Sequence, residues 1–224
     1  MGLLNFIGSS KSLRRRLFPF GFAGEVMNLV NDTWRTFSQR AVVSTEEPLT
    51  AIFRDALIKA YVAAGRGWFV TLEDPITDEA FGTELGRNDL RFYPPEHYGQ
   101  TVYFAVECKR LHVQTQSGFK HLAAQYVTQG LQRFVDGKYG EGLPCGGMLG
   151  YVMDNRIDAA FNRVKDQIRA RRNKLRMPKT NALRLPSTVL SSCAHSADTF
   201  HRCKDGKKII HHLLVKTSPR ICPA

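Results

Sequence analysis

Apolar residues recur every three or four positions in four stretches of the chain, which is the spacing of a buried helix face. These stretches are 25–37, 48–64, 118–135 and the residues that follow Asn155. The second stretch begins after Ser44 and Glu47, which are spaced as a helix capping box, and it ends at Gly65. We therefore expect four helices, the second of which begins beside a pair of glutamates.

Four other runs are short and apolar, or alternate between apolar and polar residues, as strands do. They cover residues 68–72, 87–93, 102–111 and 146–153. Proline cannot donate to a strand ladder, so Pro75 and the pair Pro94–Pro95 are expected to end the first two runs. A hairpin is expected over residues 201–216, around the turn Asp205–Gly206.

The order of these elements predicts the fold class. From residue 48 to 175 the order is helix, strand, strand, strand, helix, strand, helix, which indicates an α/β domain. We divide the chain into an N-terminal helical extension (1–43), a core (44–176) and a basic C-terminal linker and hairpin (177–224) that packs on the core. No apolar run approaches the ~20 residues of a membrane span, so we expect a cytoplasmic protein without a membrane partner.

The whole chain has a formal net charge of +12, and the positive charge is concentrated in its C-terminal third. Residues 1–150 carry 16 Lys and Arg against 15 Asp and Glu, whereas residues 151–224 carry 16 against 5. We call residues 163–184, with nine bases and one acid, the basic segment. Dense positive charge favours a polyanion, so nucleic acid is the expected partner. The candidate phosphate-binding residues are Arg163, Arg169, Arg171, Arg172 and Lys174, with Lys165 and Arg176 beside them.

The run 102–111 carries the candidate chemistry. Its even-numbered residues from Val102 to Cys108 are apolar and share one face, so Glu107 and Lys109 both point to the other. The preceding run adds one carboxylate, Asp89. Two carboxylates can bind a divalent metal ion, and a lysine can stabilise charge that develops on a phosphate, which suits phosphodiester hydrolysis. The alternative is an ion pair on a solvated face of the sheet.

Asp89 and Glu107-x-Lys109 resemble the D…(D/E)-x-K motif of the PD-(D/E)XK (restriction endonuclease-like) nuclease superfamily. The order of elements is also similar to the αβββαβ core of that family, which has its acid on the second strand and E-x-K on the third. The resemblance covers residues 44–175 and implies a mixed sheet flanked by helices. One departure is Asn88, which stands where the family motif has proline.

The resemblance also implies roles for individual residues. Asp89, Glu107 and the carbonyl of Cys108 would hold Mg²⁺ or Mn²⁺, which would activate a water molecule. Lys109 would orient that water or stabilise the pentacovalent phosphorane. A glutamate of the first core helix, Glu46 in preference to Glu47, would complete the set of carboxylates.

Gln125 and Gln129 lie four residues apart on the expected second core helix. In several nucleases of the family, glutamine or lysine on this helix touches the substrate or metal-bound water. Both residues are therefore candidate substrate-binding residues by resemblance. The simpler interpretation, which we favour, is an exposed helix face.

The five cysteines include no C-x-x-C pair, which indicates reduced thiols. Cys193-x-His195 and His201-x-Cys203 are residue types that zinc accepts, but their spacing fits no familiar zinc site. We expect buried thiols and ordinary strand histidines instead.

Three function classes stay open. The first is a metal-dependent nuclease, with DNA as the favoured substrate, that acts in a bacterial anti-phage defence system where a partner protein selects the target; this step rests on analogy with small nucleases. The second is a catalytically silent nuclease-fold subunit that binds nucleic acid or a partner protein. The third is a nucleic-acid-binding regulator in which Glu107-x-Lys109 is structural. We favour the first class, and a homo-oligomer is compatible with each.

Overall fold

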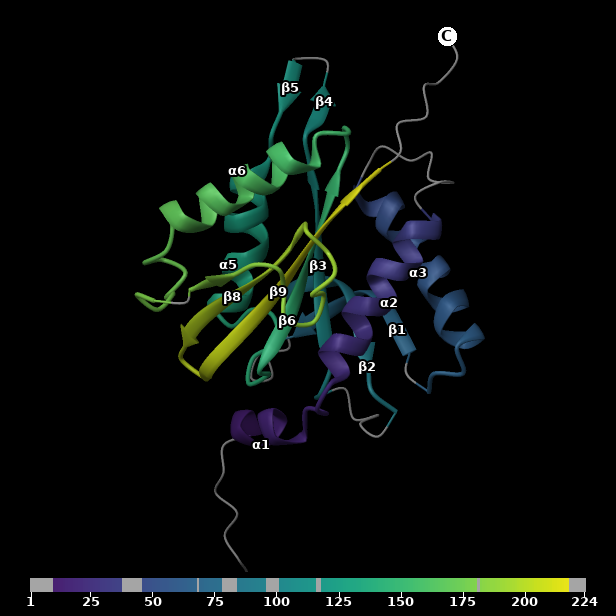
Figure 1. The fold of residues 1–224 in the computed structure, drawn as a ribbon. Coiled ribbons are helices and arrows are strands. Elements are labelled where there is room, and N and C mark those ends of the chain that lie inside the picture. Colours follow the sequence, from purple (N-terminus) through teal and green to yellow (C-terminus); the bar gives the residue numbers. More distant parts are fainter. Residues whose placement is uncertain are drawn as a thin grey trace, which may run out of the picture.

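The computed structural model describes residues 10–37, 46–67, 69–77, 84–95, 101–115, 118–180 and 182–217. These residues form a seven-stranded mixed sheet with helices on both faces (Figure 1). The strand order is β1-β2-β3-β6-β9-β8-β7, and a two-stranded ribbon, β4-β5, follows the end of β3. The prediction of an α/β fold with a mixed sheet flanked by helices is confirmed.

The central sheet combines antiparallel and parallel pairing. Its strands are β1 Phe69–Thr77, β2 Glu84–Tyr93, β3 Phe104–Leu111, β6 Cys145–Val152, β7 Leu183–Arg184, β8 Ser196–Cys203 and β9 Gly206–Lys216, and the ribbon consists of β4 Val113–Thr115 and β5 Gly118–Lys120. β1, β2 and β3 are antiparallel, β6 is parallel to both β3 and β9, and β9, β8 and β7 are antiparallel. The C-terminal hairpin thus lies within the central sheet, beside β6.

Different helices cover the two faces of the sheet (Figure 1). The elements are α1 Ser10–Leu17, α2 Phe22–Phe37, α3 Glu46–Ala63, the continuous helix α4 Ala123–Gln125, η1 Tyr126–Leu131 and α5 Gln132–Val135, and α6 Ile157–Ala170. α2 and α3 share an apolar core with Phe104, Val106 and Cys108 of β3, whereas η1, α5 and α6 share a second core with Ala105 and Leu111. None of the helices in the described residues has the length and apolar composition to cross a membrane.

The predicted helices and strands are present, but several of their boundaries were wrong. β2 begins at Glu84 and β8 at Ser196, both before the predicted starts. β1 continues through Pro75 to Thr77 because it is an edge strand of the described sheet, where proline is tolerated. The helix predicted from residue 118 begins only at Ala123. Gly118 and Leu122 have positive φ angles of 111° and 58°, which a right-handed helix excludes, and residues 118–120 form β5 instead. The predicted capping residue Ser44 lies outside the described residues.

Gly130 lets the π-helical segment η1 approach the sheet closely. A Cβ atom at this position would lie 2.5 Å from the Cε of Met148 and 3.6 Å from the Cγ of Glu107. The first distance is too short for any side chain, so glycine is required unless Met148 moves. The close approach places a helical turn directly over Glu107, which is only 1% exposed.

A chain of hydrogen bonds connects β8, β9 and η1 in the interior. His201 Nδ1 lies 2.7 Å from the Leu175 carbonyl oxygen, which can only accept, so Nδ1 donates and Nε2 accepts from Thr199 Oγ1 at 2.8 Å. Thr199 then accepts from His212 Nε2 at 2.9 Å, and His212 Nδ1 accepts from the Tyr126 hydroxyl at 3.0 Å. This order requires both histidines to be neutral. Burial lowers the pKa of His201 to about 4 and that of His212 to about 3.

We predict that folding stability falls as the pH decreases from 7 to 4.5. In this range a histidine of the unfolded chain, with a pKa of about 6.5, becomes protonated, whereas the buried histidines stay neutral. Each of His201 and His212 should therefore lower the free energy of unfolding by about 2 to 3 kcal/mol. Urea unfolding of the wild type and of His212→Gln checks this. The variant should be the less stable at pH 7, and the gap should shrink by about 2 kcal/mol at pH 4.5. A gap that does not change with pH would contradict this account.

Candidate functional site

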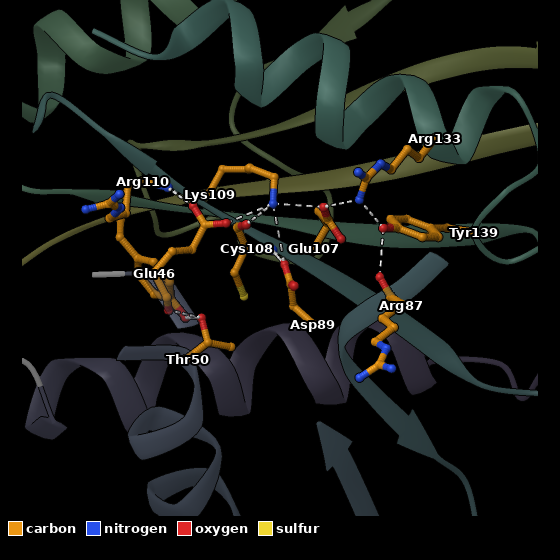
Figure 2. A network of polar contacts seen from close by, with 11 residues as sticks. Glu46, Thr50, Arg87, Asp89, Glu107, Cys108, Lys109, Arg110, Arg133 and Tyr139 are labelled. Carbon is orange, nitrogen blue, oxygen red and sulfur yellow. Dashed lines mark hydrogen bonds and ion pairs between the residues drawn. The ribbon is translucent and has the colours of Figure 1, made fainter. Parts of the chain in front are cut away.

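The strands β2 and β3 separate at the candidate site. Their regular pairing covers Phe92 with Phe104, Arg91 with Ala105 and Leu90 with Val106. At the next positions the Cys108 N–H donates to Asp89 Oδ2 at 2.6 Å, so a side chain replaces the main-chain partner (Figure 2). This contact directs the carboxylate of Asp89 toward the residues on either side of Cys108.

Lys109 is the common partner of three carboxylates (Figure 2). Its Nζ lies 2.9 Å from Glu107 Oε1, 3.0 Å from Glu46 Oε1 and 3.7 Å from Asp89 Oδ2. The same ammonium group donates to the carbonyl oxygen of Cys108 at 2.7 Å. We call Glu46, Asp89, Glu107 and Lys109 the Lys109 cluster. The structure therefore brings together every residue to which the resemblance assigned a catalytic or metal-binding role.

Glu46 reaches the cluster from the first turn of α3. Its Oε2 accepts the main-chain N–H of Arg110 at 2.8 Å, so its carboxylate bridges the side chain of one β3 residue and the backbone of the next. Thr50 donates to the Glu46 carbonyl oxygen at 2.9 Å and stabilises the first turn. Glu47 is exposed to solvent. Of the two candidate glutamates, Glu46 is the one that faces the site.

Glu107 has a buried carboxylate, and only one of its two oxygens accepts hydrogen bonds from described residues. Oε1 accepts from Lys109 and, at 3.2 Å, from Arg133 Nη1, whereas Oε2 is buried without a partner among the described residues. Burial and the nearby charge of Asp89 raise the pKa of Glu107 to about 7. Burial also raises the pKa of Asp89, although Lys109 and the Cys108 N–H oppose the change. Both carboxyl groups therefore hold protons more strongly than solvated ones, mainly because they are buried.

The ammonium group of Lys109 keeps its charge. Burial alone would lower its pKa, but the negative charges of Asp89, Glu107 and Glu46 outweigh burial and raise the pKa above that of a solvated lysine. At neutral pH this lysine can donate hydrogen bonds and stabilise negative charge. It cannot accept a proton.

Arg133 and Tyr139 support Glu107 and were not identified from the sequence. Arg133 Nη1 contacts both Glu107 Oε1 and the Tyr139 hydroxyl, which in turn donates to the Arg87 carbonyl oxygen at 2.8 Å (Figure 2). This links α5 to β2 across the buried carboxylate. One signal was available, because Arg133 is the only Lys or Arg between residues 121 and 137, but its distance from Glu107 depends on the helix register.

The donor set of the Lys109 cluster fits a hard divalent cation such as Mg²⁺. The atoms that could coordinate a metal ion are the carboxylate oxygens of the cluster and the adjacent Cys108 carbonyl oxygen. Among them, Glu107 Oε2 is a buried hydrogen-bond acceptor without a partner in the described residues. In the described residues no group of three His, Cys, Asp or Glu side chains is placed to hold a metal ion as it stands. The ammonium group of Lys109 lies within 4 Å of all three carboxylates and would have to shift for a cation to enter.

Two glutamines and the basic segment lie outside the Lys109 cluster. Gln125 and Gln129 are exposed, and neither hydrogen bonds to the cluster within the described residues. Gln125 instead lines a hollow of about 290 Å³ together with Arg163 of α6. A second hollow, of about 400 Å³, is lined by Arg169 and Arg172 on the other side of α6.

The residues of the basic segment divide into exposed side chains and side chains that hold the chain in place. Arg171 donates to Gln167, and Arg172 donates to the Pro178 carbonyl oxygen. Arg176 contacts the Val135 carbonyl oxygen and lies 3.8 Å from Asp136. The exposed candidates are Arg163, Arg169 and Lys174. These three are best placed to meet a phosphate backbone.

The cysteines and histidines considered for zinc do not form a cluster. His201 belongs to the interior hydrogen-bond chain, and His195 Nε2 lies 2.9 Å from Asp158. Cys108, Cys145, Cys193 and Cys203 are free thiols, and Cys222 lies outside the described residues. Comparisons of the chain with family models, curated proteins and solved structures found no match.

Proposed function

We propose that this chain is a metal-dependent nuclease of the PD-(D/E)XK type that hydrolyses phosphodiester bonds, with DNA as its favoured substrate. The observation that carries the proposal is the meeting of Asp89, Glu107 and Lys109 where β2 and β3 separate. Two carboxylates from adjacent strands and one ammonium group, with the Cys108 carbonyl beside them, are groups that metal-assisted phosphodiester hydrolysis uses.

The arrangement of elements supports the same proposal. Apart from the short ribbon β4-β5, which is inserted after β3, the elements α3, β1 to β3, the helix from α4 to α5 and β6 have the order αβββαβ. Asp89 lies on the second of these strands and Glu107 on the third, as in the family that the sequence resembles. β7, β8 and β9 extend the sheet beyond that core, and α2 packs beside α3 on the same face.

The residues of the Lys109 cluster take different roles in this proposal. Asp89, Glu107 and the Cys108 carbonyl would hold Mg²⁺ or Mn²⁺, with Glu46 completing the carboxylate set. A bound divalent ion would lower the pKa of a coordinated water and neutralise charge on the phosphate oxygens. Lys109 donates hydrogen bonds that orient the attacking water and stabilise negative charge on the phosphate. Arg133 and Tyr139 keep the Glu107 carboxylate in position.

The exposed bases around α6 supply the contact with nucleic acid. Phosphate contacts position the substrate and carry little sequence information, so target choice would come from elsewhere. We place the protein in the cytoplasm, in a bacterial anti-phage defence system in which a partner protein selects the target; this step is an analogy with other small nucleases. Assembly as a homo-oligomer is compatible with the same role.

A catalytically silent subunit that binds nucleic acid or a partner protein is the second candidate. The observation in its favour is that Lys109 already pairs with Glu46, Asp89 and Glu107. A network of this kind can stabilise a fold without binding any metal ion. The two candidates differ in whether the wild type cleaves DNA when Mg²⁺ or Mn²⁺ is added.

We predict that the wild type nicks or linearises plasmid DNA with Mg²⁺ or Mn²⁺ and not with EDTA. Asp89→Asn, Glu107→Gln and Lys109→Met should each lower the rate at least about 100-fold, because each removes a group that acts on the metal ion or the phosphate. Glu46→Gln should also lower the rate. The matched control is Glu47→Gln, which changes an exposed neighbour on the same helical turn and should leave cleavage unchanged.

Circular dichroism and urea unfolding establish that each variant is folded. A folded Asp89→Asn protein that cleaves at the wild-type rate would exclude this site. A folded wild type that binds DNA but cleaves with neither metal ion would favour the silent subunit.

We predict that the exposed bases of the basic segment dominate the salt dependence of DNA binding. Replacing Arg163, Arg169 and Lys174 by Gln should reduce the slope of log affinity against log salt concentration by about 2 to 3, since each lost phosphate contact removes about 0.9. The control replaces Arg35, Lys59 and Lys138, which are also exposed, so that net charge falls equally. Fluorescence anisotropy at several salt concentrations measures both slopes. Equal slopes in the two triple variants would show that binding follows net charge alone.

A further inference from the structure

The N-terminal helix α1 exposes apolar side chains. Leu13 is 54% exposed, Leu17 is 40% exposed and Phe20 is fully exposed. Because Leu13 and Leu17 lie four residues apart in a helix, they share one face. The other large apolar side chains exposed in the described residues are Ile52, Val62 and Leu185. Ile52, Val62 and Leu185 are far apart in the sequence, whereas Leu13, Leu17 and Phe20 fall within eight residues.

The polar side of α1 holds it against the body of the protein. Lys11 Nζ lies 2.5 Å from Glu141 Oε1, and Arg15 Nη1 donates to the Lys207 carbonyl oxygen at 2.6 Å. At about 100° per residue, Lys11 and Arg15 lie on the side of the helix opposite Leu13. The apolar face is therefore turned away from the body, and Figure 1 shows α1 at the edge of the molecule.

The charged residues of α1 and of its flanking sequence are all basic, and the nearby acid Glu141 lies on the polar side of the helix, beside Lys11. Residues 1–24 contain Lys11, Arg14, Arg15 and Arg16 and no Asp or Glu. On the same helical geometry Arg14 and Arg16 flank the Leu13–Leu17 face on its two sides. Four more large apolar residues, Leu3, Leu4, Phe6 and Ile7, precede the helix in the sequence. α1 thus presents two leucines between two arginines, and apolar side chains beside Lys or Arg are a feature that it shares with helices of membrane interfaces.

We propose that α1 and Phe20 bind the surface of an anionic lipid bilayer. Leu13, Leu17 and Phe20 would enter the boundary between headgroups and acyl chains, and the flanking arginines would meet lipid phosphates. Nucleic acid would also attract the positive charge of α1, but it offers the outward leucines no apolar phase. This inference is independent of the nuclease proposal. It also departs from our expectation of no membrane partner, which was based on the absence of a long apolar run and did not consider binding to a membrane surface.

Sedimentation of the full chain with lipid vesicles tests the proposal. The wild type should bind vesicles of phosphatidylcholine with phosphatidylglycerol at least about tenfold more tightly than vesicles of phosphatidylcholine alone. The triple variant Leu13→Ser, Leu17→Ser, Phe20→Ser should lose at least about tenfold in binding to the anionic vesicles. The matched control, Ile52→Ser, Val62→Ser, Leu185→Ser, removes three exposed apolar side chains elsewhere and should bind as the wild type does.

Charge variants separate the two contributions. Arg14→Gln with Arg16→Gln should weaken binding to anionic vesicles and remove the preference over neutral ones. Absence of vesicle binding by the wild type, or equal losses in the two triple variants, would overturn the proposal. Gel filtration tests whether the face binds a second copy of the chain instead. If the wild type is a dimer that does not bind vesicles, and the Leu13, Leu17 and Phe20 substitutions dissociate it, the face is a dimer interface and the proposal is overturned. All substituted apolar positions are exposed, so urea unfolding should give closely similar midpoints.

Discussion

The hydrogen bond from the Cys108 N–H to the carboxylate of Asp89 determines the geometry of the candidate site. It forms where β2 and β3 cease to pair, so one side chain satisfies a donor that would otherwise lack a strand partner. The same contact brings a second carboxylate beside Glu107. Two carboxylates in a partly buried position repel each other, and the ammonium group of Lys109 offsets that repulsion. The local break in the sheet thus produces a concentration of negative charge that needs a cation.

The two layers of helices hold this charged group from opposite faces of the sheet. α3 presents Glu46 at its first turn, where the carboxylate also binds the backbone of β3. On the other face, Gly130 allows η1 to lie against Glu107, and Arg133 then reaches the same carboxylate. Burial of Glu107 follows from this packing, and so does its excess acceptor, Oε2. A buried acceptor without a donor is costly unless a water molecule, a proton or a metal ion satisfies it, and a metal ion is the case that we propose.

The sequence predicted the parts of the site that follow from local periodicity. Alternation along β3 placed Glu107 and Lys109 on one face, and the structure has them there, with Phe104, Val106 and Cys108 on the other. Periodicity could not reveal Arg133, because its contact with Glu107 depends on how closely η1 packs against β3. It also could not distinguish strand from helix at residues 118–120, where Phe119 fits both patterns and the backbone of Gly118 decides. Nor could it show that β9 joins β6, since that pairing is between distant segments.

The central claim is that the Lys109 cluster binds a divalent cation through Asp89 and Glu107. Calorimetric titration of Mn²⁺ into the wild type and into Asp89→Asn tests it without reference to any substrate. We expect saturable binding to the wild type and at least about tenfold weaker binding to the folded variant. Glu141→Gln, which removes an exposed carboxylate that is not part of the Lys109 cluster, should bind as the wild type does. Absence of saturable binding, or equal affinity in Asp89→Asn, would mean that the cluster is a closed network of ion pairs.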